Sequence, residues 1–302
     1  MNNRTAYLPY IALAAVCIIW GTTYLALRVA VLHFPPFLFT AIRQCSAGLL
    51  LLGIMAVASP AKLPSVKQLA RLAVAGFFMI TLGNGLVAWA EMHISSGMAA
   101  ILCSTMPAMV IIINLSIHRE EKPTLPIVAG VFLGLAGITI IFGEHITEFS
   151  KTEYLLGIIM TLLAVVSWAF GSLWIKKQST DFNPFVSAGF QMIFGGLLAL
   201  PLSVVFDDLQ TVQWTTEFFY PLLYLIVFGS VIAYASYLYA LRKLSMTIVS
   251  LYAYVNPLVA VVLGWLLLDE KLNGIIGIGI LTTIGGIYLV NRKNRYKNLG
   301  EA

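Results

Sequence analysis

The sequence predicts an all-α membrane protein with ten transmembrane helices arranged as two inverted five-helix repeats. First, 60% of the 302 residues are hydrophobic and only 10% are charged, whereas about 25% of a soluble domain is charged. The mean hydropathy is correspondingly high, at +0.91. Second, apolar windows of about 20 residues, long enough to cross a bilayer as a helix, recur along the chain. Third, the second half of the chain repeats landmarks of the first half.

Ten apolar windows are separated by short polar connections, none of which is long enough to hold a soluble domain. The first window is too long for the apolar region of a signal peptide and lacks a convincing cleavage site, so we expect it to be retained. Cys17, Cys45 and Cys103 lie inside windows, where we expect packing residues and no disulfide or metal cluster. The predicted limits are Tyr7 to Val31, Pro36 to Ala58, Leu69 to Ala90, Gly97 to Ile117, Thr124 to Phe142, Tyr154 to Ile175, Pro184 to Phe206, Phe218 to Leu241, Ser245 to Leu268 and Gly274 to Val290.

The distribution of lysine and arginine over the connections predicts the orientation. Alternate connections lie on the same side of the membrane, so the connections form two sets. The set that does not include the N-terminus carries only Lys151 and Lys271. The set that begins with the N-terminus carries Arg4, Lys62, Lys67, Arg71, Arg119, Lys122, Lys176, Lys177, Arg242, Lys243, Arg292, Lys293, Arg295 and Lys297. Because cytoplasmic connections are rich in these residues, we expect both termini in the cytoplasm and the protein in the cytoplasmic (inner) membrane. Orientation then accounts for the basic balance without any binding of nucleic acid.

Residues in the first half recur in the second half at an almost constant offset. An offset of 148 places Trp20 on Trp168, Pro36-Phe37 on Pro184-Phe185, Arg43 on Gln191 and Gly48 on Gly196, and an offset of 150 places Ala90 on Ala240, Ser95 on Ser245 and Pro107 on Pro257. We therefore divide the chain into repeats 1–148 and 149–302. Each repeat holds five spans, and this odd number makes the second repeat enter the membrane from the opposite side. Two such halves can open alternately around a central site, which is typical of a transporter.

Several stretches resemble a known family. IIWGTTYLALRVA, FPPFLFTAIRQCSAGLLLL and GNGLVAWAEMHISSGMAAIL, with paired motifs that begin Glu-Lys at 121 and 270, are similar to the drug/metabolite transporter superfamily, EamA family, in its YedA-like branch. The resemblance covers essentially the full length. It implies ten helices, cytoplasmic termini, a central cavity and the movement of small organic solutes, often outward. Such solutes include amino acids, nucleosides, amines and drug-like compounds. We expect no cofactor, and a monomer or homodimer in the lipid.

Arg43 lies about seven residues into the second window, roughly 10 Å from its end at the rise of an α-helix. An arginine near a bilayer centre costs about 2.5 to 3.5 kcal/mol on insertion scales, so it should face the bundle interior. One interpretation is a clamp for a carboxylate or other anionic group of the solute. The other is a structural arginine that pairs with Glu91 or with freed carbonyl groups. Arg28, nearer its helix end, is expected to be an interfacial anchor.

Glu91 lies at the outer end of the third window, and apart from it no Asp or Glu lies well inside any window. If transport is coupled to protons, Glu91 or the neighbouring His93 is the candidate group. The alternative is a solvated carboxylate in a connection, because Glu91 directly follows Ala90, the last residue of the window.

Pro107 and Pro257 occupy matching positions about halfway along the fourth and ninth windows. Proline removes a helical hydrogen bond, and interrupted helices at equivalent points of two halves indicate a central site with a hinge. Tyr252 and Asn256, one turn apart beside the second proline, are candidate binding residues. The alternative is a packed kink that neighbouring helices satisfy.

Further candidates for the binding site are polar or aromatic residues near the middle of their windows. Asn84 could contact the solute or form a packing hydrogen bond. Trp20 and Tyr24 share a helix face, and Trp168 is the repeat equivalent of Trp20, so these rings could form the walls of a cavity. Aromatic residues in membrane proteins also form interfacial belts, which is the alternative. Gln191, at the repeat position of Arg43, completes the predicted substrate-binding residues.

Other classes of function fit the sequence less well. An intramembrane enzyme needs a nucleophile with its base, a metal cluster or paired carboxylates, and we find no such set. All four histidines, His33, His93, His118 and His145, lie at or beyond window ends. An ion channel would be expected to show a charged ring or a carbonyl filter, and a facilitated-diffusion pore stays open as an alternative. We therefore expect a secondary transporter that exports a small organic solute by alternating access around a midplane cavity.

Overall fold

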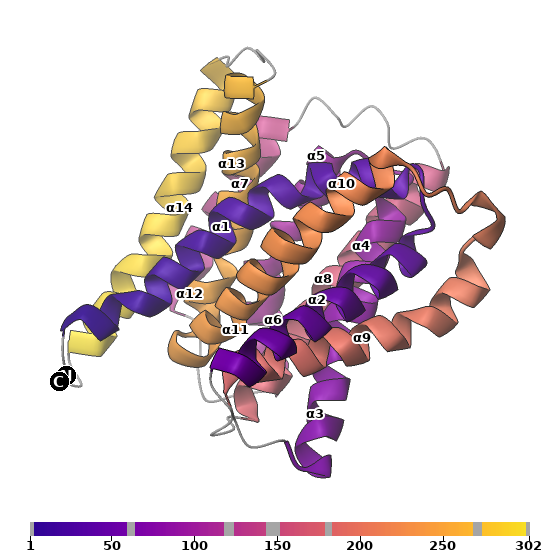
Figure 1. The fold of residues 1–302 in the computed structure, drawn as a ribbon. Coiled ribbons are helices and arrows are strands. Elements are labelled where there is room, and N and C mark those ends of the chain that lie inside the picture. Colours follow the sequence, from indigo (N-terminus) through magenta and orange to yellow (C-terminus); the bar gives the residue numbers. More distant parts are fainter. Residues whose placement is uncertain are drawn as a thin grey trace.

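The computed structural model describes residues 3–58, 64–117, 124–142, 152–178, 183–267 and 274–299, and all regular structure in these ranges is helical. The predicted all-α class is confirmed. Figure 1 shows long helices packed side by side, with the first turns of α1 near the last turns of α14. The described residues do not include several on which the sequence predictions rest, namely Lys62, His118, Arg119, Lys122, His145, Lys151 and Lys271.

Ten apolar helical segments follow one another along the described parts of the chain. The first five are α1 (Asn3–Val31), α2 (Pro36–Ala58), α3 (Val66–Gly76) continuing through the π-helix η1 (Phe77–Asn84) into α4 (Gly85–Ala90), α5 (Ser96–Cys103) followed by α6 (Met106–Ile117), and α7 (Leu125–Phe142). The second five are α8 (Thr152–Lys177), α9 (Pro184–Phe206), α10 (Thr216–Tyr224) continuing through the π-helix η4 (Leu225–Ile232) into α11 (Ala233–Lys243), α12 (Met246–Ser250) followed by α13 (Tyr252–Leu267), and α14 (Gly274–Leu299).

The lengths of these segments suit a bilayer. In the described residues, seven continuous stretches are long and apolar enough to cross a membrane by length and composition, and three more are apolar but shorter. The shorter stretches are Leu125–Ile141, Met246–Val259 and Gly274–Val290. Some helices run past the predicted limits because polar residues such as Lys176 and Lys243 continue the last turn.

The two halves share irregularities that hydropathy does not reveal. η1 and η4 differ by 148 positions at both ends, and both interrupt an otherwise α-helical span. Spans four and nine are also interrupted, at Ser104–Thr105 and at Leu251. Each interruption precedes a proline: Pro107 is the second residue of α6, where its missing N–H costs little, and Pro257 lies within α13. A hinge role for the two prolines stays a prediction.

Helices of the two halves pack in equivalent pairs. α2 packs along α9, its repeat equivalent, and α7 packs along α14, its own (Figure 1). η1 and α4 pack on α8, and their equivalents η4 and α11 pack on α1. Glycines allow the helices to approach closely in both the α2–α9 pair and the α7–α14 pair. A Cβ added to Gly48 would lie 2.7 Å from the carbonyl oxygen of Gly189, and one added to Gly286 would lie 2.5 Å from that of Gly130.

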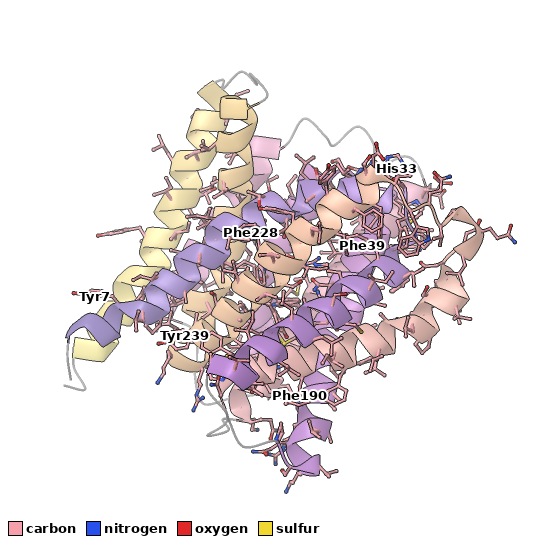
Figure 2. The ribbon with its side chains drawn as sticks, viewed as in Figure 1. Tyr7, His33, Phe39, Phe190, Phe228 and Tyr239 are labelled. Atoms are coloured by element: carbon pink, nitrogen blue, oxygen red, sulfur yellow. The ribbon has the colours of Figure 1, made fainter. Side chains whose placement is uncertain are left out.

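The outer surface of the bundle is apolar. Val57 is 88% exposed and Leu281 is 72% exposed, and the side chains of Tyr7 and Phe228 are also on the outside (Figure 2). A soluble monomer rarely exposes so much contiguous apolar surface. The surface therefore faces lipid, and polar groups turn inward, where Arg43 and Gln191 are both buried.

Candidate solute-binding site

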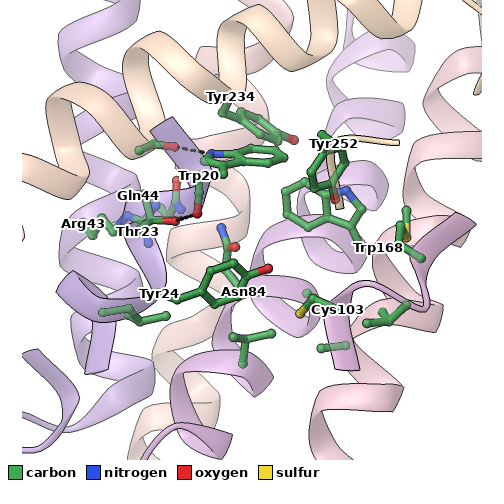
Figure 3. Close-up of a pocket in the computed structure, with 17 residues that line it drawn as sticks. Trp20, Thr23, Tyr24, Arg43, Gln44, Asn84, Cys103, Trp168, Tyr234 and Tyr252 are labelled. Carbon is green, nitrogen blue, oxygen red and sulfur yellow. Dashed lines mark hydrogen bonds between the residues drawn. The ribbon is translucent and has the colours of Figure 1, made fainter. Parts of the chain in front are cut away.

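A cavity of about 90 Å³ lies inside the bundle, and both halves contribute to its wall. The lining residues are Trp20, Thr23, Tyr24, Leu27, Arg43, Gln44, Gly83, Asn84, Val87, Cys103, Met106, Ala164, Val165, Trp168, Gly229, Tyr234 and Tyr252. They come from α1, α2, η1, α4, α5 and α6 of the first half, and from α8, η4, α11 and α13 of the second half. Figure 3 shows Arg43 and Gln44 on one side, Trp168 and Tyr252 on the other, and Tyr24 and Asn84 between them.

Arg43 is the charged residue in this wall. The sequence places it on α2, which packs against η4, and its side chain is only 7% exposed. Its Nε donates a hydrogen bond to the hydroxyl oxygen of Ser230, 3.0 Å away, in η4. Both carboxylate oxygens of Glu91 accept no hydrogen bond from any residue that the structure describes, so the pairing considered for Arg43 is not formed. The guanidinium thus joins the two halves at the cavity.

Aromatic rings form the opposite wall. Trp20 and Trp168, equivalent residues of the two halves, meet edge to face with ring centroids 5.4 Å apart. Trp20 also packs edge to face on Tyr252, with a centroid distance of 4.9 Å. The indole Nε1 of Trp20 donates to the carbonyl oxygen of Gly229 at 2.9 Å (Figure 3), and that of Trp168 donates to the hydroxyl of Tyr237 at 3.3 Å. These two tryptophans therefore line the cavity and do not form an interfacial belt.

The remaining polar wall includes residues that the sequence indicated and residues that it did not. Asn84, the last residue of η1, lines the cavity, as does Tyr24, whose hydroxyl interacts with the thiol of Cys103. Sequence reasoning treated Cys103 as a packing residue and passed over Gln44. The sequence signal for Gln44 was its place next to Arg43. In the structure both side chains are buried, and the Oε1 atom of Gln44 has no hydrogen-bond partner among the described residues.

Two predicted binding residues, Gln191 and Asn256, do not line the cavity. The Oε1 atom of Gln191 accepts a hydrogen bond of 2.8 Å from the hydroxyl of Tyr234, which does line it. With its amide oriented to satisfy its neighbours, Asn256 donates to the carbonyl oxygens of Tyr252 at 2.9 Å and Cys17 at 3.0 Å. Both amides are buried behind the wall, so in this structure they support lining residues and helix contacts.

Two cations cap the C-terminal ends of helices at equivalent places. The Nη1 atom of Arg28 donates to the carbonyl oxygens of Glu91 and Ile94, just beyond α4. Lys176 lies 148 positions later. Its Nζ donates to the carbonyl oxygens of Leu241 at 2.7 Å and Leu244 at 2.6 Å, at the end of α11. A cation at a helix C-terminus satisfies free carbonyl groups and complements the helix dipole. Arg28 therefore acts as a helix cap, and its role as an interfacial anchor stays a prediction.

Glu91 is fully buried, with 0% of its surface exposed. The interpretation of Glu91 as a solvated carboxylate in a connection is wrong, because α1 and α8 both pack against α4 at whose end it lies. His93 is half-buried, and its ring lies 4.5 Å from that of Trp89. Neither residue lines the cavity, although Val87, one turn before Glu91, does. Their role in coupling stays a prediction.

The chemistry available in the cavity is recognition by one cation, amides and aromatic rings. In the described parts of the chain, no three His, Cys, Asp or Glu side chains gather closely enough to hold a metal ion. An arginine among aromatic rings can bind the planar anionic group of an organic molecule while the rings cover its apolar part.

Comparison with known proteins identifies the family. The model of the EamA-like transporter family matches residues 8–143 and again residues 155–292. YedA, an uncharacterized inner membrane transporter of Escherichia coli, is 31% identical over 92% of this chain and 89% of its own. YvbV, an uncharacterized transporter of Bacillus subtilis, is 26% identical over 97% of this chain and 93% of its own. A solved crystal structure with 18% identity superposes with a TM-score of 0.77, covering 95% of this chain and 98% of the other, and shows the same fold.

These matches agree with the helical architecture and the lipid-facing surface. The family and the relatives named above are transporters and not enzymes, and the apolar spans make this chain a multi-pass protein of the inner membrane. The chain belongs to the EamA-like transporter family.

Proposed function

We propose that this protein is a secondary transporter that exports a small organic solute through the cytoplasmic membrane. In this proposal the repeats 1–148 and 149–302 are threaded through the membrane in opposite senses and open alternately to either side of the cavity. The observation that carries it is the joint construction of the cavity: Arg43 and Trp20 of the first half bond to Ser230 and Gly229 of the second half. A site held by both halves changes when the halves move relative to each other.

The equivalent helix pairs support this mechanism. The contacts of η1 and α4 with α8 and those of η4 and α11 with α1 exchange places when the two halves are exchanged. Two arrangements related by that exchange differ in which end of the cavity is closed. A cavity of about 90 Å³ is small for an organic solute, since ligand pockets usually have volumes of about 300 to 1,000 Å³. Entry of the solute therefore needs the halves to separate on one side.

The composition of the wall narrows the class of solute. Arg43 favours one carboxylate or other anionic group, and the rings of Trp20, Trp168 and Tyr252 favour an apolar or aromatic body of the solute. Asn84 and Gln44 can add hydrogen bonds to a polar substituent. Amino acids and other organic acids fit these features better than simple amines, because a solute cation would lie close to Arg43.

Transport in proteoliposomes tests the proposal. We would measure uptake of labelled amino acids, nucleosides and amines, with and without a pH gradient, by vesicles that contain the wild type, Arg43→Ala or Gln191→Ala. Gln191 is the matched control because it has the equivalent place in the second half but lies behind the cavity wall. We expect saturable flux in the wild type, a large loss for Arg43→Ala at normal abundance of folded protein, and a smaller loss for Gln191→Ala. If Arg43→Ala loses folded protein to the same extent as it loses flux, the result would favour a structural role for Arg43.

The same vesicles test the alternative of a channel. Ion currents without saturable flux of any solute would contradict alternating access. Labelling of single cysteines tests the threading: Lys67 and Lys177 are exposed and are expected on the cytoplasmic side, whereas Asp208 is exposed and expected outside. Substitution of each by cysteine, with the wild type as the control for its own three cysteines, should give that pattern with an impermeant maleimide. Labelling of positions 67 and 177 from different sides would refute the inverted repeats.

A further inference from the structure

The capped helix ends of the two halves differ in one respect. Arg28 and Lys176 have equivalent positions and cap equivalent carbonyl groups, but the first cap carries the side chain of Glu91 where the second carries that of Leu241. Leu241 is 2% exposed and Glu91 is 0% exposed, so both side chains are buried. The second half shows that a cap of this kind forms without a carboxyl group. Maintenance of the helix end therefore does not explain why Glu91 carries one.

The carboxyl group of Glu91 has an unusual environment. Neither of its oxygens accepts a hydrogen bond from the residues that the structure describes. A buried carboxylate without donors is strongly disfavoured relative to its protonated form. A protonated carboxyl group needs fewer hydrogen-bond donors and no neighbouring positive charge to be stable when buried. It can become ionised when water or a cation reaches it. The side chain is thus held where its protonation can change with the conformation of the bundle.

Titratable and charged groups surround Glu91 on several helices. The charges of Arg28 on α1 and Arg43 on α2 act on its carboxyl group, and Tyr24 on α1 and Cys103 on α5 also interact with it. From α8, Tyr154 packs on the same cluster of side chains as Ala90 and Ile94, the residues that flank the end of α4. Arg43, Tyr24 and Cys103 line the cavity. Glu91 therefore lies outside the cavity wall but interacts electrostatically with Arg43, the charged residue of that wall.

We propose that Glu91 is the proton-binding group of this transporter and that its proton is exchanged in step with occupation of the cavity at Arg43. This inference rests on the proposed transport function, whose site it completes. When Glu91 is protonated, Arg28 and Arg43 face no fixed negative charge, and an anionic group of the solute is favoured at Arg43. When Glu91 is ionised, its charge competes with the solute for the field of both guanidinium groups. Binding of a proton and binding of an anionic solute thus favour each other, and the coupling is reciprocal. The two then cross together, so export is driven by the outward gradient of the solute and the proton leaves with it.

A measurement of proton binding tests this inference without a solute. Proteoliposomes adsorbed on a solid-supported membrane are exposed to rapid steps from alkaline to progressively more acidic solution, and the transient displacement of charge is recorded. A proton that reaches a buried group crosses part of the low-dielectric interior, so it gives a current that saturates with falling pH. We expect that current in the wild type and its loss, to the level of protein-free liposomes, in Glu91→Gln and Glu91→Leu.

Matched variants decide between this role and the alternatives. Glu217 is exposed and His93 is half-buried next to Glu91, and Glu217→Gln and His93→Gln should both keep the wild-type current. Arg43→Gln should keep the current and shift its midpoint to higher pH, because a positive charge that favours ionised Glu91 has been removed. The Glu91→Leu variant reproduces the side chain of the second half, so it should fold.

Three results would overturn the inference. They are an undiminished current in folded Glu91→Gln, loss of the current only in His93→Gln, and failure of both Glu91 variants to yield folded protein, which would make the carboxyl structural. If transport assays show saturable solute flux while Glu91→Gln keeps the proton current, only the coupling role fails. Absence of solute flux with a normal proton current would instead refute the proposed transport.

Discussion

Removal of the Lys176 cap should destabilise the fold by an amount that its geometry allows us to estimate. In Lys176→Met, the carbonyl oxygens of Leu241 and Leu244 lose donors at 2.7 and 2.6 Å. Hydrogen bonds to charged groups contribute about 1.5 to 3 kcal/mol each. The lysine is half-buried, and water can replace part of the interaction, so we expect the free energy of unfolding to fall by about 2 to 4 kcal/mol.

Titration of the purified protein with denaturing detergent, followed by tryptophan fluorescence, measures this difference. Lys176→Arg keeps a cation and should recover most of the stability, whereas Lys177→Met, which removes the exposed neighbouring lysine, should have little effect. Arg28→Met should give a loss of similar size at the other end of the bundle. A change below about 0.5 kcal/mol for Lys176→Met, the size expected for an ordinary surface substitution, would refute the reasoning that the cap supports the end of α11.

Three further outcomes can be checked with the same protein. Gly229→Ala should reduce solute flux at normal abundance, because its Cβ would lie 3.1 Å from Nη2 of Arg43 at the cavity, whereas Gly53→Ala, which meets nothing within 4 Å, should be neutral in the same flux assay. Tyr234→Phe should lower the free energy of unfolding in the detergent titration by about 1 to 3 kcal/mol, because the buried Oε1 of Gln191 loses its donor. Burial raises the pKa of Asp207, against the hydrogen bonds from the backbone of Leu38 and Phe37; its contribution to stability is therefore present below its ordinary pKa of 3.8 and lost as pH rises through the higher folded value. Asp207→Asn should reduce this pH dependence of the unfolding midpoint, and an unchanged dependence would contradict it.

The membrane spans could be predicted from the sequence, because a span is recognised by the length and the apolar composition of a segment alone. The proposed repeat rests on sparse landmarks such as Trp20 and Trp168, which recur at one offset although most residues around them differ. Contacts between helices were less accessible to sequence reasoning. The burial of Glu91 depends on how α1 and α8 cover the end of α4, which no local pattern specifies.

The candidate site was partly predictable for the same reason. Six of the eight predicted binding residues line the cavity, since polar and aromatic residues near mid-span turn away from lipid. The two that do not, Gln191 and Asn256, are also buried, so burial was foreseen and only the direction of the side chain was not. The π-helices were missed altogether, because FFMITLGN and LIVFGSVI share almost no residues and nothing in their hydropathy distinguishes them from α-helix.

Those π-helices have a practical consequence for mapping the transport pathway. The carbonyl oxygen of Phe78 in η1 accepts a hydrogen bond of 2.7 Å from Ser167, and that of Gly229 in η4 accepts one from Trp20. Main-chain atoms here serve as recognition groups for neighbouring side chains. Alanine scanning leaves such atoms in place and would register Phe78 and Gly229 only through changes in bulk. Replacement of single amides by esters, which weakens the carbonyl as an acceptor, would report on them directly.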